Sequence, residues 1–231
     1  MKRHFEKELE SLKTTLIKMA SLAEDAIRLT IKAFMTADVA LAQKIVDNDE
    51  RINSMEIEVD NAIVDLMALQ QPVAGDLRFI LAAQKINNDL ERIGDHAVNI
   101  AQSAITFARR EEATPLMELP QMVEIVESML RDSIDAFINQ DASLGMSVLE
   151  KDDIIDRLNM NLVQDFVQRM KSDRNLIEAG IDIIRVSRNL ERVADLATNI
   201  AEEVIFVSQA RVVKHHAEEK DDNLKVKHKG R

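Results

Sequence analysis

The chain carries one acidic motif twice, and the polar residues of this motif have a spacing that suits metal binding. Residues 88–101 read Asn-Asp-Leu-Glu-Arg-Ile-Gly-Asp-His-Ala-Val-Asn-Ile-Ala, and residues 188–201 read Arg-Asn-Leu-Glu-Arg-Val-Ala-Asp-Leu-Ala-Thr-Asn-Ile-Ala. The shared polar residues are Glu91 and Glu191, Arg92 and Arg192, Asp95 and Asp195, and Asn99 and Asn199. Residues four apart lie on one face of an α-helix, so each copy presents two carboxylates and an amide in one row.

A bound cation would explain why both copies keep this row. Two like charges four residues apart slightly destabilise a bare helix, and neighbouring outward positions have diverged, as His96 and Leu196 show. Carboxylate and amide oxygens suit Mg²⁺, Ca²⁺, Mn²⁺ and iron, and zinc also stays open. One helix offers too few ligands, so we expect a neighbouring helix to contribute. The second helix of each half has oxygens at the same spacing, at Asp49 and Asn53 and at Asp152 and Asp156.

A solvated helix face is the simpler interpretation of any single copy of this motif, because charge-rich faces are common. Recurrence of the same Glu, Arg, Asp and Asn favours a site. Asn99 and Asn199 are possible further ligands. Arg92 and Arg192 either bridge to an acid on an adjacent helix or contact a partner, and both roles stay open.

The helices that must position these residues are predicted by apolar residues spaced alternately four and three apart, the pattern of helices packed in a left-handed bundle. The pattern runs over residues 5–33, 41–69 and 79–107. Asp38 is a good N-cap for the second helix, and Pro72 with Gly75 ends it. Leu90 and Ile93 belong to the packed seam, so the acidic row should face away from the core.

The second half of the chain repeats the first. Met19 matches Met122 and Asp49 matches Asp152, a displacement of 103 residues; three extra residues around Pro72 then reduce it to 100. We predict an all-α fold of two tandem antiparallel three-helix bundles, each closing its own core. Residues 1–112 and 113–213 form the bundles, and residues 214–231 form a charged, disordered tail. Helices of about 30 residues, about 45 Å long, would make the molecule rod-like.

Composition narrows the possible functions. A formal charge of −11, with no Trp or Tyr, argues against nucleic-acid binding. The absence of Cys excludes thiolate metal sites and disulfides. No apolar run reaches the roughly 18 residues of a membrane span, and the charged N-terminus does not resemble a signal peptide. These features fit a cytoplasmic protein.

Other polar candidates have simpler explanations. Glu24 with Arg28, and its repeat at Glu127 and Arg131, is predicted to form an ion pair within one helix. A place for Glu24 among the metal ligands stays open. His96 has no counterpart in the second half and is interpreted as a boundary residue. The pair at residues 215–216, both histidines, is assigned to a solvated tail.

With these residues identified, the chain resembles the PhoU family, the accessory proteins of the bacterial phosphate-specific transport system. The resemblance covers residues 5–210 and rests on the doubled Leu-Glu-Arg-Ile/Val-Gly/Ala-Asp block, on the loop 71–78, and on Asp49 and Asp152. It implies tandem three-helix bundles and surface clusters of iron or other divalent ions. These would be held by Glu91/Asp95 and Glu191/Asp195, supported by Asp49/Asn53 and Asp152/Asp156. Asn53 departs from the acidic pattern and makes the first-half site less charged.

The resemblance also implies a role. Such proteins repress phosphate-starvation signalling when phosphate is plentiful, by contacting a PhoR-like sensor kinase and a PstB-like transporter ATPase. They work in the cytoplasm at the inner membrane face, often as homodimers.

Two alternatives remain open from the sequence. A di-iron enzyme on a helical bundle would need inward-pointing Glu residues and Glu-x-x-His motifs, and no His here follows a Glu at that spacing. A purely structural coiled-coil protein would bind no metal. The regulator is therefore expected to be non-enzymatic.

Overall fold

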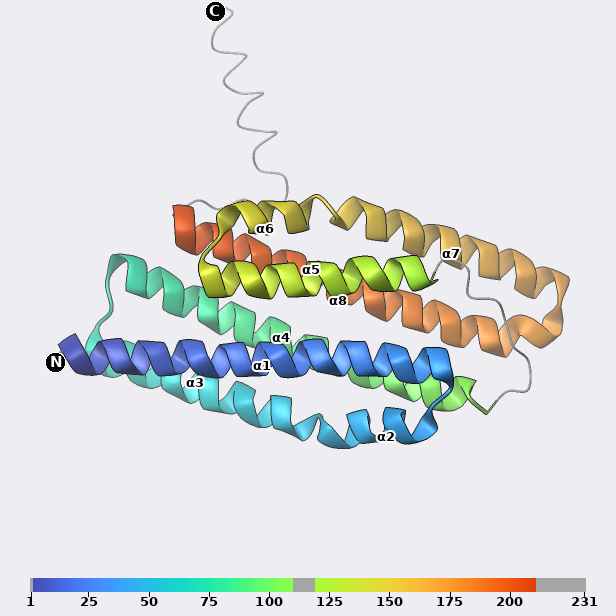
Figure 1. Ribbon diagram of the computed structural model, residues 1–231, viewed down its shortest axis with the longest axis horizontal. Coiled ribbons are helices and arrows are strands. Elements are labelled where there is room, and N and C mark those ends of the chain that lie inside the picture. The colour runs from blue at the N-terminus through green and yellow to red at the C-terminus, as the bar shows by residue number, and fades with distance from the viewer. Residues whose placement is uncertain (1, 110–118, 211–231) are drawn as a thin grey trace, which may run out of the picture.

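The computed structural model describes residues 2–109 and 119–210, and all regular structure in these ranges is helical (Figure 1). The elements are α1 (Lys2–Thr36), α2 (Val39–Asn48), α3 (Glu50–Gln70), α4 (Ala74–Phe107), α5 (Leu119–Asn139), α6 (Ala142–Leu149), α7 (Asp152–Ser172), η1 (Arg174–Leu176) and α8 (Ile177–Gln209). The predicted boundary at 112/113 and the tail 214–231, with its two histidines, lie outside the described residues. No helix within the described ranges has both the length and the apolar character needed to cross a bilayer.

The turn after the first helix is built in the same way in both halves. Ala37 and Gln140 adopt left-handed backbone angles, with φ of 52° and 53°. The side chains of Asp38 and Asp141 then cap the next helix, accepting hydrogen bonds from the amides of Leu41 and Leu144 at 2.9 and 3.1 Å. The N-cap predicted at Asp38 is confirmed, because its carboxylate satisfies an amide that the first helical turn leaves unpaired.

The second predicted helix of each half is in fact two helices, so the expectation of one continuous helix over residues 41–69 was wrong. α2 ends at Asn48 and α3 begins at Glu50, with Asp49 at the junction. The amide of Ile52 bonds the carbonyl of Asp49 at 2.9 Å, a contact three residues apart that tightens the turn. A bend is visible there and between α6 and α7 (Figure 1). Apolar periodicity continues through the junction, so it could not indicate the bend.

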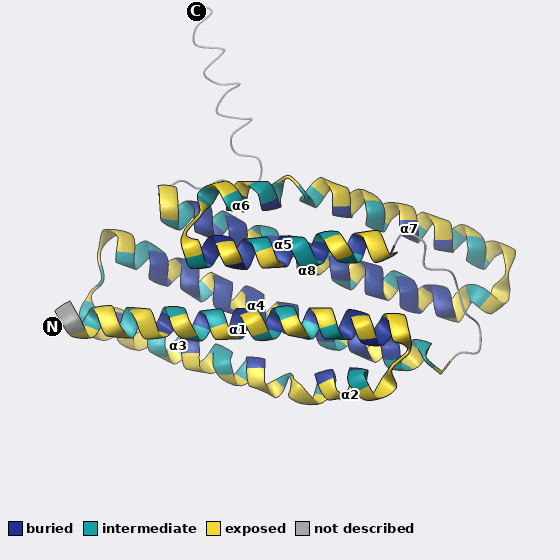
Figure 2. Cartoon of the chain, viewed as in Figure 1, coloured by how far each residue is buried: buried dark blue, intermediate teal, exposed yellow. Residues whose placement is uncertain are grey.

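The two bundles lie side by side along their lengths (Figure 1). α4 packs most extensively against α8, and α1 packs against α5. The pairs α2–α3 and α6–α7 cover the outer sides, where Figure 2 shows mostly exposed residues. The predicted all-α fold of tandem three-helix bundles is confirmed, with one helix of each bundle bent.

The core is continuous through both bundles. The buried apolar residues form a single cluster that includes Leu16 and Ile93 from the first half and Leu130 and Val193 from the second. Figure 2 shows the buried stripes of α4 and α8 running along the middle of the molecule. The expectation that each half closes a separate core is therefore corrected, because α4 and α8 also bury apolar residues against each other.

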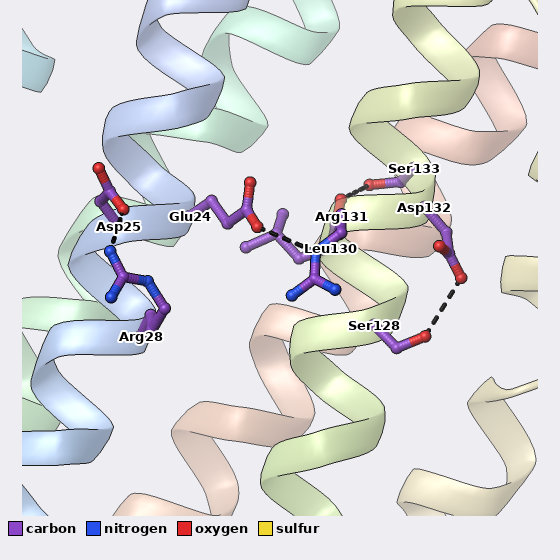
Figure 3. A network of polar contacts seen from close by, with 8 residues as sticks. All are labelled: Glu24, Asp25, Arg28, Ser128, Leu130, Arg131, Asp132 and Ser133. Atoms are coloured by element: carbon purple, nitrogen blue, oxygen red, sulfur yellow. Dashed lines mark hydrogen bonds and ion pairs between the residues drawn. The ribbon is translucent and has the colours of Figure 1, made fainter.

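Glu24 and Arg131 connect the two bundles instead of pairing within their own helices. The Nε of Arg131 on α5 lies 3.3 Å from the carboxylate of Glu24 on α1. Figure 3 shows the two side chains pointing toward one another. Arg28 pairs with Asp25, and this contact raises the pKa of Arg28, to which Glu127 contributes further. The predicted Glu24–Arg28 and Glu127–Arg131 pairs were therefore wrong. The spacing within a helix does not reveal which acid or base the neighbouring bundle supplies.

A second polar contact joins α4 to α8 inside the interface. The Nζ of Lys85 lies 2.8 Å from the carboxylate of Glu203, which is only 3% exposed, whereas Lys85 is 50% exposed. Lys85 also lies 5.9 Å from the ring centre of Phe206. Such a contact stabilises a buried carboxylate, since removing Lys85 takes away a charge that offsets the loss of water around Glu203.

We expect Lys85→Met to destabilise the protein by about 2 kcal/mol. Combining it with Glu203→Gln should recover part of this loss, because the buried charge is then removed as well. Urea denaturation of both single variants and the double variant measures the coupling. Lys44→Met, at an exposed position of α2, is the control and should change stability by less than about 0.5 kcal/mol. Strictly additive effects would contradict the coupling.

Candidate metal centres

The first acidic cluster forms where the α2–α3 junction meets α4. Burial raises the pKa of Glu91, and the nearby carboxylates of Asp95, Glu56 and Asp49 raise it further. Burial also raises the pKa of Asp49, to which Asp95 adds. Glu91 is half-buried and Asp95 is exposed, in agreement with the predicted outward face. Four carboxylates, from α4, α3 and the α2–α3 junction, thus lie close enough to repel one another.

Gly94 allows the junction to approach α4 so closely. A methyl group at this position would lie 3.0 Å from the Cδ1 of Ile52 and 3.3 Å from a carboxylate oxygen of Asp49. Both distances are tighter than ordinary van der Waals contacts, so a side chain here would push the junction outward. The glycine inside the first copy of the motif therefore helps to place Asp49 beside Glu91 and Asp95.

Glu56 is a member of this cluster that the sequence analysis missed. It lies one helical turn beyond Asn53 on α3, and its carboxylate raises the pKa of Glu91. Glu56 follows Asp49 at the i, i+7 spacing, which places both on one face of a helix. The equivalent residue of the second half is Asn159, so a comparison of the two halves for repeated acids does not reveal Glu56. Glu56 supplies the negative charge that Asn53 lacks.

Asn53 has an oxygen that is available to a cation. Its side-chain amide donates a hydrogen bond of 3.3 Å to the carboxylate of Asp49. Its Oδ1 atom is buried and has no hydrogen-bond partner. A buried oxygen without a donor is costly, and it offers a neutral ligand next to the carboxylates.

The second cluster brings together Asp152 and Asp156 of α7 with Glu191 and Asp195 of α8. Burial raises the pKa of Asp152 to about 6, helped by the charges of Asp156, Asp195, Asp153 and Glu191 in that order. Burial likewise raises the pKa values of Glu191 and Asp195. The acids predicted from the repeat therefore do gather in one place.

The arginines make the two clusters electrically different. Arg192 lies 3.0 Å from Asp195 and 3.7 Å from Glu191, so it partly neutralises the second cluster. Arg92 lies 3.8 Å from Asp89, a buried acid of its own helix, and it lowers the pKa of Glu91 by less than burial and the neighbouring carboxylates raise it. Both arginines thus pair with acids on the same helix, which corrects the alternative in which they bridge to an adjacent helix.

His96 lies at the contact between the two bundles. Its Nδ1 is 2.9 Å from the Oδ1 of Asn189 on α8, and its charge slightly lowers the pKa of Asp195 against the raising effect of burial. Asn99 and Asn199 are exposed one turn beyond the acids, and their role as ligands stays a prediction.

The residues present suit hard cations in type. Two clusters of mutually repelling carboxylates, one with the unpartnered Asn53 oxygen, form an oxygen-rich donor set. As the side chains stand, no group of three or more His, Asp or Glu residues within the described parts of the chain converges closely enough to hold an ion. Binding would therefore require rotamer changes. Because the acids lie at the surface, the clusters also differ from di-iron enzyme sites, which point into a bundle.

The raised pKa of Asp152 predicts a pH-dependent stability. Its pKa is about 6 in the folded protein against 3.8 normally, so the folded state favours the protonated form. This contribution is fully present below pH 4 and is lost as the pH rises through 6. We expect Asp152→Asn to be more stable than the parent by about 1 kcal/mol at pH 7.5, a value reduced for partial exposure.

Denaturation with a chelator present, at pH 7.5 and at pH 4, measures this difference without bound metal. It should disappear at pH 4. Asp135→Asn, at an exposed position of α5, is the control and should show no such pH dependence. Equal destabilisation by Asp152→Asn at both pH values would contradict the assignment.

The chain is similar in sequence to a known protein family and to proteins named as its members. The family model for the PhoU domain matches residues 16–104 and 119–204. A phosphate-specific transport system accessory protein PhoU homolog from Aquifex aeolicus is 39% identical over 94% of this chain and 98% of that protein. A homolog of the same name from Pseudomonas putida is 37% identical over 92% of this chain and 84% of its own.

Solved structures agree with this placement. The crystal structure of PhoU from Pseudomonas aeruginosa has a TM-score of 0.87 and 36% identity, and covers 90% of this chain and 100% of its own. That of the phosphate transport system regulatory protein PhoU from Streptococcus pneumoniae has a TM-score of 0.85 and 28% identity over 91% and 99%. These are names of accessory and regulatory proteins, which confirms the expectation of a non-enzymatic protein. The chain belongs to the PhoU family.

Proposed function

We propose that this protein is an accessory protein of a phosphate transport system, which represses phosphate uptake and phosphate-starvation signalling when phosphate is plentiful. It acts as an adaptor between a PstB-like ATPase of the transporter and a PhoR-like sensor histidine kinase. The observation that carries this proposal is the pair of acidic clusters at the surface of a rigid double bundle, in a chain whose relatives are named for phosphate transport.

The acidic clusters are the proposed binding sites for multivalent metal ions, either iron or Mg²⁺, Mn²⁺, Zn²⁺ or Ca²⁺. Glu91, Asp95, Asp49 and Asn53 would hold the first ion, with Glu56 nearby. The second site would use the four acids Asp152, Asp156, Glu191 and Asp195. A cation there would offset the repulsion among carboxylates that burial and mutual proximity keep unfavourable.

The proposed place of action is the cytoplasm, at the inner face of the membrane, where the transporter ATPase and the kinase are both reachable. The protein would work there as a homodimer. The long packed helices suit an adaptor, because α4 and α8 each carry one acidic cluster and are joined along their lengths. A contact at one cluster can therefore be transmitted through a stiff element to the other half.

An adaptor without bound metal is the second candidate. It is favoured by one observation, that no three acids or histidines among the described residues already converge on a common point. In this case the clusters would attract basic partner segments directly. Metal binding by the purified protein separates the two candidates.

We expect 1 mM Mn²⁺ to raise the melting temperature of chelator-treated protein by several degrees, since a ligand that binds only the folded state stabilises it. A variant with Glu91→Gln, Asp95→Asn, Glu191→Gln and Asp195→Asn should lose this shift. The control variant Glu124→Gln with Asp135→Asn removes two exposed acids elsewhere and should keep it. An undiminished shift in the fourfold variant would place the metal outside the clusters.

Partner binding gives the second test. Glu91→Ala combined with Glu191→Ala should reduce retention of a PstB-like ATPase or a PhoR-like kinase about tenfold or more on immobilised protein, because both acidic faces lose a carboxylate. The same Glu124/Asp135 control should retain both partners. If the double alanine variant binds both as well as the parent does, the clusters are not the docking surface.

A further inference from the structure

The two halves differ in the size of the side chains beside the helix junction. In the first half, a cavity of about 200 Å³ opens between α1, the α2–α3 junction and α4. Its apolar lining comprises Leu22, Ala26, Leu29, Ile45, Ile52 and Val98. Ile45 and Ile52 are buried at its floor, whereas Leu22, Ala26, Leu29 and Val98 remain half-exposed.

Small residues keep this cavity open. Ala26 lines it, and the equivalent residue of the second half is Met129, which is fully buried. Gly94 also lines it, and its equivalent is Ala194, likewise fully buried. At these two positions the second half therefore carries the larger side chains.

An ion pair occupies the mouth of the equivalent hollow in the second half. Lys151, which takes the place of Asn48, reaches back to α5 and lies 2.6 Å from Asp132 and 2.9 Å from Ser128. Figure 3 shows Ser128 and Asp132 side by side on α5. Asn48 at the mouth of the first-half cavity is exposed and carries no charge.

Negative charge lies along one side of the open cavity. Asp25 and Asp49 line it; Asp25 is paired with Arg28, whereas Asp49 belongs to the first acidic cluster with Glu91 and Asp95. Arg51 is the one cation among its lining residues. An apolar floor with acids along one side fits an apolar group that has a positive charge next to it.

We propose that this cavity is a docking point that receives one apolar side chain from a basic segment of a partner protein, and that only the first half provides it. The volume suits a single aliphatic or aromatic side chain, because pockets for small molecules are typically about 300–1,000 Å³. The adjoining carboxylates bind the basic residues that flank this anchor. The proposal goes beyond metal binding and requires no bound ion.

Peptide probes test the proposal with the full chain in the presence of a chelator. Three synthetic alanine-rich helical peptides are compared: one with lysines and a central Phe, one with lysines and Ala at that position, and one with glutamates and the Phe. Methyl NMR follows Ile45 and Ile52 in the cavity, and Ile155 at the equivalent place in the second half. We expect the Lys–Phe peptide to shift the first two alone and to bind at least tenfold more tightly than either other peptide.

Two variants copy the second half into the first. Ala26→Met fills the cavity, and Asn48→Lys places a cation at its exposed mouth without touching the core. Each should weaken binding of the Lys–Phe peptide about tenfold or more. Ser21→Met adds the same side chain at an exposed position of α1 outside the lining and should leave binding unchanged.

Several results would overturn the proposal. They are failure of the Lys–Phe peptide to bind at 1 mM, equal binding to the Asn48→Lys variant, and equal binding of the Glu–Phe peptide. Phenethylammonium ion alone binding as tightly as the peptide would make the cavity a small-molecule site instead. Because no metal is present and neither the kinase nor the ATPase is used, none of these results bears on the proposed adaptor role.

Discussion

The contact between α4 and α8 is the constraint on which the rest of the structure depends. Each of these helices buries apolar residues against its own bundle and against the other, and residues such as Ile93 and Val193 are inaccessible to water. Burying a side chain of this size contributes about 1.5–3 kcal/mol, so the rotation of each helix about its axis is firmly set. The rotation of each helix therefore also fixes the direction of the acidic side chains between these apolar residues. They face the bent helix of their own bundle at the edge of the molecule.

This arrangement holds like charges together at a cost. Glu91 and Asp49 in one cluster, and Asp152 in the other, are each partly removed from water beside further carboxylates, which raises their pKa values. Core packing elsewhere must offset this unfavourable energy. Sites where burial and neighbouring charges shift the pKa values of carboxylates are often functional. The arrangement is therefore better explained by something that binds the acids than by solvation alone.

Sequence periodicity predicted the helices, the repeat and the outward acidic row, because burial of a regular stripe fixes which way a helix faces. It could not predict the bend at Asp49, since apolar residues continue on both sides of it. Nor could it predict the Glu24–Arg131 contact, which depends on how two bundles meet. The sequence repeat did not reveal Glu56 either, because its counterpart in the second half is an asparagine. What repeats in the sequence was predictable, whereas what distinguishes the halves required the structure.

The differences between the halves follow a physical pattern. Where the repeated acids lie, both copies have kept four carboxylates, the first by using Glu56 in place of an acid at Asn53. One turn away, the first half has small residues at Ala26 and Gly94, whereas the second has larger ones. A larger side chain at the position of Ala26 is compatible with this fold, because the equivalent Met129 is fully buried. If the cavity of the first half receives a partner side chain as proposed, the two copies have separated two tasks: both hold the charges, and the first also offers an opening beside them.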